Sequence, residues 1–264
     1  MTGEAIARHR IYIIESSDPQ FDDLYHGIVK GFSNRALDLM RPYSVMLVNK
    51  NSRAVVAYVL IWEFVREDGS TFQKESRFVQ EGAFLDGTVR HYSGPGSRAG
   101  VLIEGSSQRL ASPMFNLAES SDLTAWADSS LRQLDRVESV QKELSQLKGI
   151  SVSVDGAFFE DGTFVGPDRS GFFSAFKAEF NAKQDLLTEI LADVHRGSKR
   201  QETLAKLKGI GEPASALSSD SEYEKNRKAF AKEMFATFDV GFDTGRAYAY
   251  QASYKLRPSF RKSE

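Results

Sequence analysis

Four acidic side chains lie within the fifteen residues VDGAFFEDGTFVGPD, residues 154–168: Asp155, Glu160, Asp161 and Asp168. Carboxylates gathered among glycines and aromatic residues suit two kinds of chemistry. Two carboxyl groups that face one substrate can act as general acid and general base, and carboxylates with backbone carbonyls can hold Ca²⁺. Asp155, Glu160 and Asp161 are therefore the candidate catalytic residues, and Asp155 and Asp161 are the candidate metal ligands.

Both kinds of site meet an objection in the spacing. A calcium loop of the EF-hand type needs oxygen ligands at its first, third and fifth positions, but a loop that begins at Asp155 has Ala157 and Phe159 at the last two. Glu160 and Asp161 are neighbours, so on a strand their side chains point to opposite faces. A calcium site of another type and a pair of catalytic carboxylates both remain hypotheses after this comparison.

The Asp-Gly pair of this stretch has relatives in the same chain, which favours a structural role. An apolar run, Asp-Gly, Thr and another apolar residue recur in FVREDGSTF, GAFLDGTV and GAFFEDGTFV, residues 64–72, 82–89 and 156–165. Asp-Gly suits a two-residue hairpin turn, which needs positive φ at both central positions. Asp161 and Gly162 are accordingly predicted to form a turn between strands, and Asp168 or Ser170 to cap the helix that follows.

Other motifs that suggest chemistry fail on their details. The segment SGPGSRAG, residues 93–100, has Ala99 where a dinucleotide-binding loop needs its third glycine, and it lacks the Gly-Lys-Ser/Thr ending of a phosphate-binding loop. The histidines are scattered, with no pair at metal-ligand spacing; they are His9, His26, His91 and His195. The sequence predicts no cofactor.

Composition excludes several classes of function. The chain has 264 residues, no cysteine and a formal net charge of -2, so disulfides and thiolate metal sites are excluded and the balanced charge argues against nucleic acid as a partner. No apolar run reaches the about 20 residues that span a bilayer, so no transmembrane segment is predicted. No secretory leader is visible. We expect a soluble protein, cytoplasmic by default, with export open if a leader has been removed.

The segments that must position these side chains change in pattern along the chain. Residues 1–39 predict a strand and a helix that pack on the core. Residues 40–166, with alternating apolar positions between turns, predict a β-sandwich that includes a helix near 123–148. Residues 168–255 have apolar stripes at helical spacing and predict an antiparallel helical hairpin. Residues 256–264 predict a flexible basic tail.

The expected fold class is α+β: an antiparallel β-sandwich, immunoglobulin-like in architecture, followed by the long helical hairpin. Trp62 in a long early strand resembles the core tryptophan of immunoglobulin-type domains. The segments PYSVMLVNKNSRAVVAYVLIWEF and VDGAFFEDGTFVGPD also resemble stretches of uncharacterised bacterial proteins. That resemblance implies a bacterial origin and carries no catalytic or binding residue to this chain.

The lack of a catalytic motif favours a non-enzymatic binding or assembly protein of unknown ligand. Its partner surface would be the sandwich loops or the aromatic-rich hairpin, so we expect a protein partner or self-association through the C-terminal helices. The alternative is a hydrolase that acts on a carbohydrate or a related polymer through paired carboxylates among Asp155, Glu160 and Asp161. Two of these carboxyl groups meeting in a pocket beside Tyr58 or Trp62 would favour the hydrolase.

Overall fold

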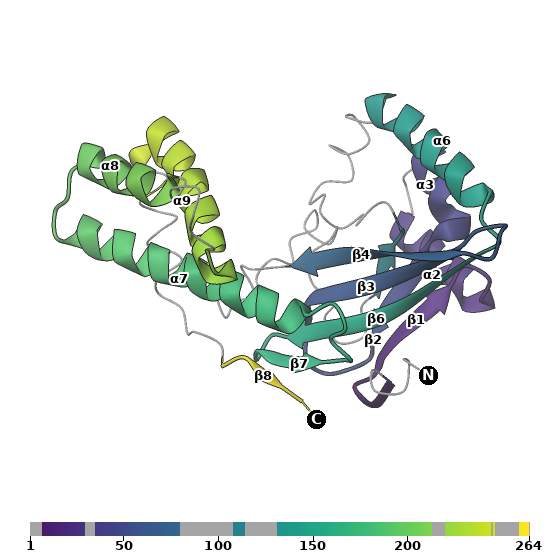
Figure 1. Cartoon of the computed structure of the whole chain (residues 1–264). Coiled ribbons are helices and arrows are strands. Elements are labelled where there is room, and N and C mark those ends of the chain that lie inside the picture. The colour runs from purple at the N-terminus through teal and green to yellow at the C-terminus, as the bar shows by residue number, and fades with distance from the viewer. Residues whose placement is uncertain are drawn as a thin grey trace. The chain divides into compact units, whose positions relative to one another are not determined.

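The computed structural model of the chain describes residues 7–29, 35–79, 108–113, 131–212, 220–243, 245 and 259–263. They form a mixed α/β structure with two sheets (Figure 1). The chain divides into two compact units. The first comprises Met1–Ala83, Thr88–Ser170 and Ser259–Glu264, and the second comprises Phe84–Gly87 and Gly171–Pro258. The first unit thus combines residues from both ends of the chain.

The first unit holds an antiparallel sheet with the strand order β1-β2-β5. Its strands are β1 (Ile11–Glu15), β2 (Val45–Asn49) and β5 (Gln108–Ala111). All five residues of β2, VMLVN, are buried. A strand that is apolar at consecutive positions is stable only when both of its faces are covered, and both faces of β2 are buried in apolar clusters, Val45 and Leu47 in one and Met46 and Val48 in another.

The second sheet of this unit has the order β4-β3-β6-β7-β8. Its strands are β3 (Val55–Val65), β4 (Thr71–Val79), β6 (Gly149–Phe159), β7 (Thr163–Val165) and β8 (Arg261–Lys262). The pairs are antiparallel except β7 and β8, which are parallel. The sequence predicts a flexible tail over 256–264, of which the structure describes residues 259–263. Arg261 and Lys262 form an edge strand, since the N–H of Ser263 donates to the carbonyl of Phe164 over 2.8 Å.

One apolar core is shared by residues of both sheets. Its members on β2 and β3 include Val45, Leu47, Tyr58, Leu60, Trp62 and Phe64. The alternate residues of β2, Met46 and Val48, form a separate cluster with Phe21 and Tyr25 of α2 (Pro19–Val29). Helix α2 therefore covers the face of the first sheet that points away from the shared core.

Two further helices complete the described part of the first unit. Helix α3 (Arg35–Met40) is followed by a 3₁₀ turn (Arg41–Tyr43), and α6 (Leu131–Ser145) carries Val137, Val140 and Leu144 into the shared core. Helix α6 lies inside the helix predicted near 123–148, of which residues 123–130 are outside the described residues. In Figure 1, α3 and α6 lie close together beside the sheets.

Both described Asp-Gly pairs form turns, but not of the predicted type. Gly69 and Gly162 each have a φ of 81°, whereas neither aspartate has a positive φ. The N–H of each glycine donates to a carbonyl three residues earlier, at 3.0 and 2.9 Å. This pattern is a type I turn followed by a left-handed glycine, so only the glycine needs positive φ. The third pair, Asp86-Gly87, lies outside the described residues.

The second unit is helical. Its described helices are α7 (Phe172–His195), α8 (Arg200–Gly211) and α9 (Glu222–Val240). The sequence predicts a hairpin of two long helices, but the chain breaks at Gly197, which has a φ of 89°, and α8 starts again with a capping box between Lys199 and Glu202. Among the described helices, none is long and apolar enough to cross a membrane.

Apolar and ionic contacts hold α7, α8 and α9 together. Their shared cluster includes Leu187, Ile190, Leu207, Phe230, Met234 and Phe238. Glu189 of α7 pairs with Lys206 of α8 (2.7 Å) and with Arg227 of α9. Burial raises the pKa of Glu189, but hydrogen bonds and charges from these two cations outweigh it and hold the pKa below its usual value. The aromatic face of α9 is thus covered within its own unit.

Candidate functional site

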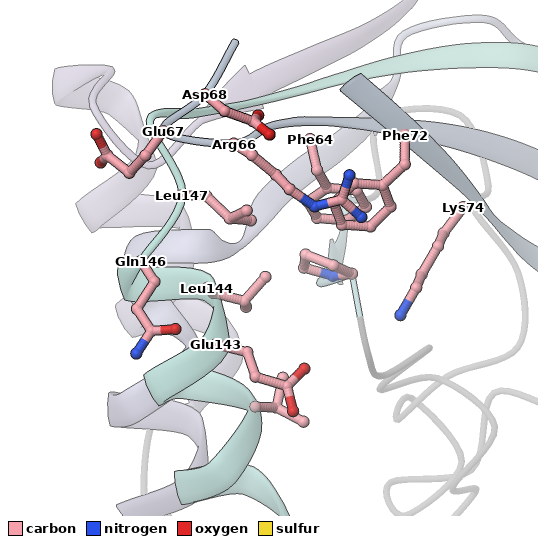
Figure 2. Close-up of a pocket in the computed structure, with 12 residues that line it drawn as sticks. Phe64, Arg66, Glu67, Asp68, Phe72, Lys74, Glu143, Leu144, Gln146 and Leu147 are labelled. Carbon is pink, nitrogen blue, oxygen red and sulfur yellow. The ribbon is translucent and has the colours of Figure 1, made fainter. Parts of the chain in front are cut away.

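A pocket of about 600 Å³ lies in the first unit, at the end where β3 turns into β4 and α6 ends (Figure 2). Its apolar lining is Phe64 of β3, Phe72 of β4, Val140 and Leu144 of α6, Leu147 shortly after α6, and Pro113 shortly after β5. Its polar lining is Arg66, Glu67, Asp68, Lys74, Glu143 and Gln146. An apolar floor with few polar groups is the usual composition of a small-molecule site, and the volume lies within the usual range.

The turn between β3 and β4 builds an aromatic stack at one wall of the pocket. Phe64 and Phe72 face each other in the antiparallel register, and their rings stack with centroids 4.8 Å apart and an interplanar angle of 19°. The guanidinium carbon of Arg66 lies 4.4 Å from the Phe72 ring centroid. Its Nη1 donates to the Ser70 hydroxyl over 3.2 Å, so the guanidinium plane is held by both contacts.

The turn residues themselves are already occupied. The Asp68 carboxylate accepts the N–H of Ser70 over 2.8 Å, and hydrogen bonds from the Ser70 side chain and backbone lower the pKa of Asp68. In Figure 2, Glu67 extends away from the stacked rings. Asp68 therefore holds the loop, and neither acidic residue of the turn pairs with Arg66 among the described contacts.

Lys74 and Glu143 extend from opposite walls toward the same space (Figure 2). Lys74 follows Phe72 by two residues on β4, so the two side chains share a face of the strand. Glu143 comes from the last turn of α6, and Gln146 directly follows the helix. Both charged side chains are exposed, and neither forms an ion pair with a residue in the described part of the chain.

A backbone hydrogen bond joins the segment after α6 to the end of β3, and so fixes the helix wall of the pocket relative to the strand wall. The N–H of Lys148 donates to the carbonyl of Val65 over 2.8 Å, and the N–H of Leu147 to the carbonyl of Leu144 over 3.2 Å. Because Val65 directly precedes Arg66, this contact sets the helix end opposite the stacked arginine. The pocket is thus supported by backbone hydrogen bonds as well as by the core.

The acidic stretch, by contrast, serves the backbone. Asp155 is 1% exposed, and its two carboxylate oxygens accept the N–H groups of Arg169 and Ser170, each over 2.9 Å. Its own carbonyl accepts the N–H of Asp168 over 2.9 Å. Asp155 therefore fastens the loop after β7 to β6. A buried carboxylate with both oxygens occupied in this way has no lone pair directed at solvent for a substrate or a metal.

Glu160 and Asp161 lie in the turn between β6 and β7. The Glu160 carboxylate is exposed and accepts the N–H of Ala54 over 3.4 Å. Asp161 accepts the N–H of Thr163 over 2.9 Å and pairs with Arg53 over 3.0 Å. Burial raises the pKa of the Asp161 carboxyl, but the hydrogen bonds from Thr163 and Arg53 outweigh it and lower the pKa. These contacts secure the turn to the start of β3.

Asp168 does not cap the long helix. It has a positive φ of 56° and pairs with Lys262 of β8 over 2.6 Å. Helix α7 begins at Phe172 after Gly171, without a side-chain cap, so the predicted cap at Asp168 or Ser170 is wrong. At this junction the backbone N–H groups of Arg169 and Ser170 donate to Asp155 instead. They can do so because the loop turns back onto β6 before the helix starts.

Within the described residues, no three histidine, aspartate or glutamate side chains gather in a way that could hold a metal ion. His9 lies against the Phe159 ring, with centroids 6.4 Å apart, and burial together with the charges of Arg53 and Arg8 lowers its pKa. His26 contacts the carbonyl of Asp22 one helical turn away. These two histidines are occupied by local contacts.

Sequence reasoning missed Arg66, Lys74 and Glu143, although the sequence contains a usable signal for two of them. Around the turn at Asp68, the chain has an aromatic residue followed two positions later by a cation on each strand: Phe64 with Arg66, and Phe72 with Lys74. In a hairpin this pattern places both pairs on one face. The chain matches no protein-family model, no curated protein and no solved structure.

Proposed function

We propose that this chain is a non-enzymatic binding protein and that its ligand occupies the pocket between the β3–β4 turn and the end of α6. The observation that carries the proposal is the combination of an apolar floor with charged side chains that lack a described ion-pair partner, Lys74 and Glu143. Charged groups directed over an apolar surface gain an interaction when an amphipathic ligand binds.

The alternative of a hydrolase with paired carboxylates has no such support. Asp155 is buried with both oxygens bonded to backbone N–H groups, whereas Asp161 pairs with Arg53 at the turn. None of the three candidate carboxylates, Asp155, Glu160 and Asp161, lines the pocket. We therefore keep the binding function and place it in a part of the chain that differs from the acidic stretch.

We also propose that the two sheets form an open sandwich and that the helical unit can serve a protein partner or a second copy of the chain. The core shared by β2 and β3 supports the sandwich. The surface of α9 supports association only at its end, where Val240 is 93% exposed. Light scattering over a range of protein concentrations tests this association, and a monomer throughout would contradict it.

The binding function is tested by a ligand-observed NMR screen of small amphipathic molecules. Glu143→Trp places a large side chain over the pocket from an exposed position of α6, so we expect it to abolish the binding of hits. Lys142→Trp, at the neighbouring exposed position outside the pocket, is the matched control and should leave binding unchanged. A screen without hits that respond to Glu143→Trp would contradict the proposal.

A further inference from the structure

Resting on the proposed binding function, we infer the chemical class of the ligand: a planar aromatic molecule with an anionic group at one end and a hydrogen-bond donor at the other. The cationic end of the site is provided by Arg66 and Lys74 from the strands. The acceptor end is provided by Glu143 from α6 (Figure 2). The ring would lie over the apolar floor between them.

The first argument is the fixed position of Arg66. Its guanidinium stacks on the Phe72 ring, 4.4 Å from the centroid, and the Ser70 hydroxyl is its hydrogen-bond acceptor within the described residues. A guanidinium has five N–H donors in one plane, so one contact leaves a pair of donors for a carboxylate. Because stacking fixes the plane in advance, little side-chain freedom is lost when such a bidentate pair forms.

The second argument is the position of Lys74. It lies opposite Trp62 in the β3–β4 register, on the face of β4 that also carries Phe72. A lysine on the inward face of an edge strand can also protect that edge from aggregation. Protection of the edge would need neither the second cation, Arg66, nor the stacked rings of Phe64 and Phe72. An anionic aromatic ligand would contact Lys74, Arg66 and the stacked rings.

The third argument comes from the helix wall. Glu143 would repel a ligand that was only anionic, since its carboxylate faces the same space as Lys74. A ligand with a hydrogen-bond donor at its far end would instead donate to the Glu143 carboxylate. The pocket has a volume of about 600 Å³, which is typical of small-molecule sites. It therefore suits a ligand with one ring or two fused rings better than it suits a protein partner.

Three fluorescent naphthalene probes separate these contributions. The probe 6-amino-2-naphthoate carries both end groups, 2-naphthoate lacks the donor, and 6-amino-2-naphthamide lacks the anion. We expect the first to bind most tightly to the full chain. Arg66→Gln should weaken its binding on the order of tenfold to a hundredfold, as the loss of a charge-assisted contact does, without changing the binding of the amide. Glu143→Gln should weaken only the probes that carry an amino group.

The control variant is Arg77→Gln, since Arg77 lies on the opposite face of the same strand and pairs with Glu75. It should leave all three affinities unchanged. Equal binding of 6-amino-2-naphthoate and 6-amino-2-naphthamide, or an Arg66→Gln variant that binds 6-amino-2-naphthoate with unchanged affinity, would overturn the inferred ligand class. If library fragments bind in a manner that Glu143→Trp abolishes while none of the three probes binds, the class is wrong and the binding function stands. If nothing binds at the pocket, both are wrong.

Discussion

Replacing Asp155 with alanine is expected to destabilise the first unit strongly. The buried carboxylate accepts two backbone N–H groups, those of Arg169 and Ser170, each over 2.9 Å. A hydrogen bond to a charged acceptor contributes about 1.5–3 kcal/mol. Both donors would be left without this acceptor, so Asp155→Ala should lower the free energy of unfolding by about 3–6 kcal/mol. Asp155→Asn keeps one acceptor oxygen but turns an amide N–H toward the second donor, and should cost about 1.5–3 kcal/mol.

Urea unfolding followed by tryptophan fluorescence measures this loss. The chain has two tryptophans, so a Trp126→Phe background leaves Trp62, in the shared core of the first unit, as the reporter for that unit alone. This choice avoids treating a chain of two units as a single two-state system. Glu160→Gln, an exposed change in the same stretch, is the control and should shift stability by less than about 0.5 kcal/mol. A loss below about 1 kcal/mol for Asp155→Ala would refute the assignment of Asp155 as a backbone staple.

Three further outcomes follow from packing and charge. Gly156→Ala would bring a Cβ within 2.2 Å of the Phe164 ring and should destabilise the protein by at least about 1–3 kcal/mol. Gly209→Ala in α8, whose Cβ would meet nothing within 4 Å, should stabilise it by up to about 1 kcal/mol. Thermal melts measure both changes, and the reverse order of stability would contradict this packing. Burial above all raises the pKa of Tyr25 to about 12 from 10.0, so stability present below pH 10.0 should be lost as pH rises toward 12, and Tyr25→Phe should reduce that loss in alkaline unfolding curves. The pKa of Glu189 is lowered from 4.5, so its contribution is present above that value and lost as pH falls through the folded pKa. Glu189→Gln should therefore flatten the acid limb of helical circular dichroism against pH, and an unchanged limb would show that its two cationic partners contribute nothing.

The parts of the fold that depend on local sequence could be predicted. The start of α2 is one: the Asp18 carboxylate accepts the N–H of Gln20 over 2.8 Å, as its place before Pro19 indicates. The Asp-Gly turns are another, although the aspartate keeps negative φ because the loop is one residue longer than a two-residue hairpin. The break near Gly197 is also local, yet two apolar stripes at the same helical spacing concealed it.

The roles that depend on distant partners could not be predicted. Asp155 meets Arg169 and Ser170 fourteen and fifteen residues later, so its type alone suggests a catalytic acid as well as it suggests a staple. The residues of the pocket are still farther apart along the sequence. Lys74 and Glu143 come to line one pocket only when α6 packs beside β3 and β4. The role of Asp155 and the position of the pocket both depend on which residues are buried and which are paired. Neither property can be read from the spacing of residues along the chain.

The parallel pair of β7 and β8 has a consequence for how the protein is made. On the ribosome, the strands β1 to β7 emerge first, and the helices of the second unit emerge before Arg261 and Lys262 do. Until then, Asp168 has no Lys262 to pair with and β7 is an open edge that another nascent chain could pair with. Translation speed through the helical segment, and chaperones that cover this edge, should therefore influence the yield of native protein more than they would for a unit whose strands are contiguous.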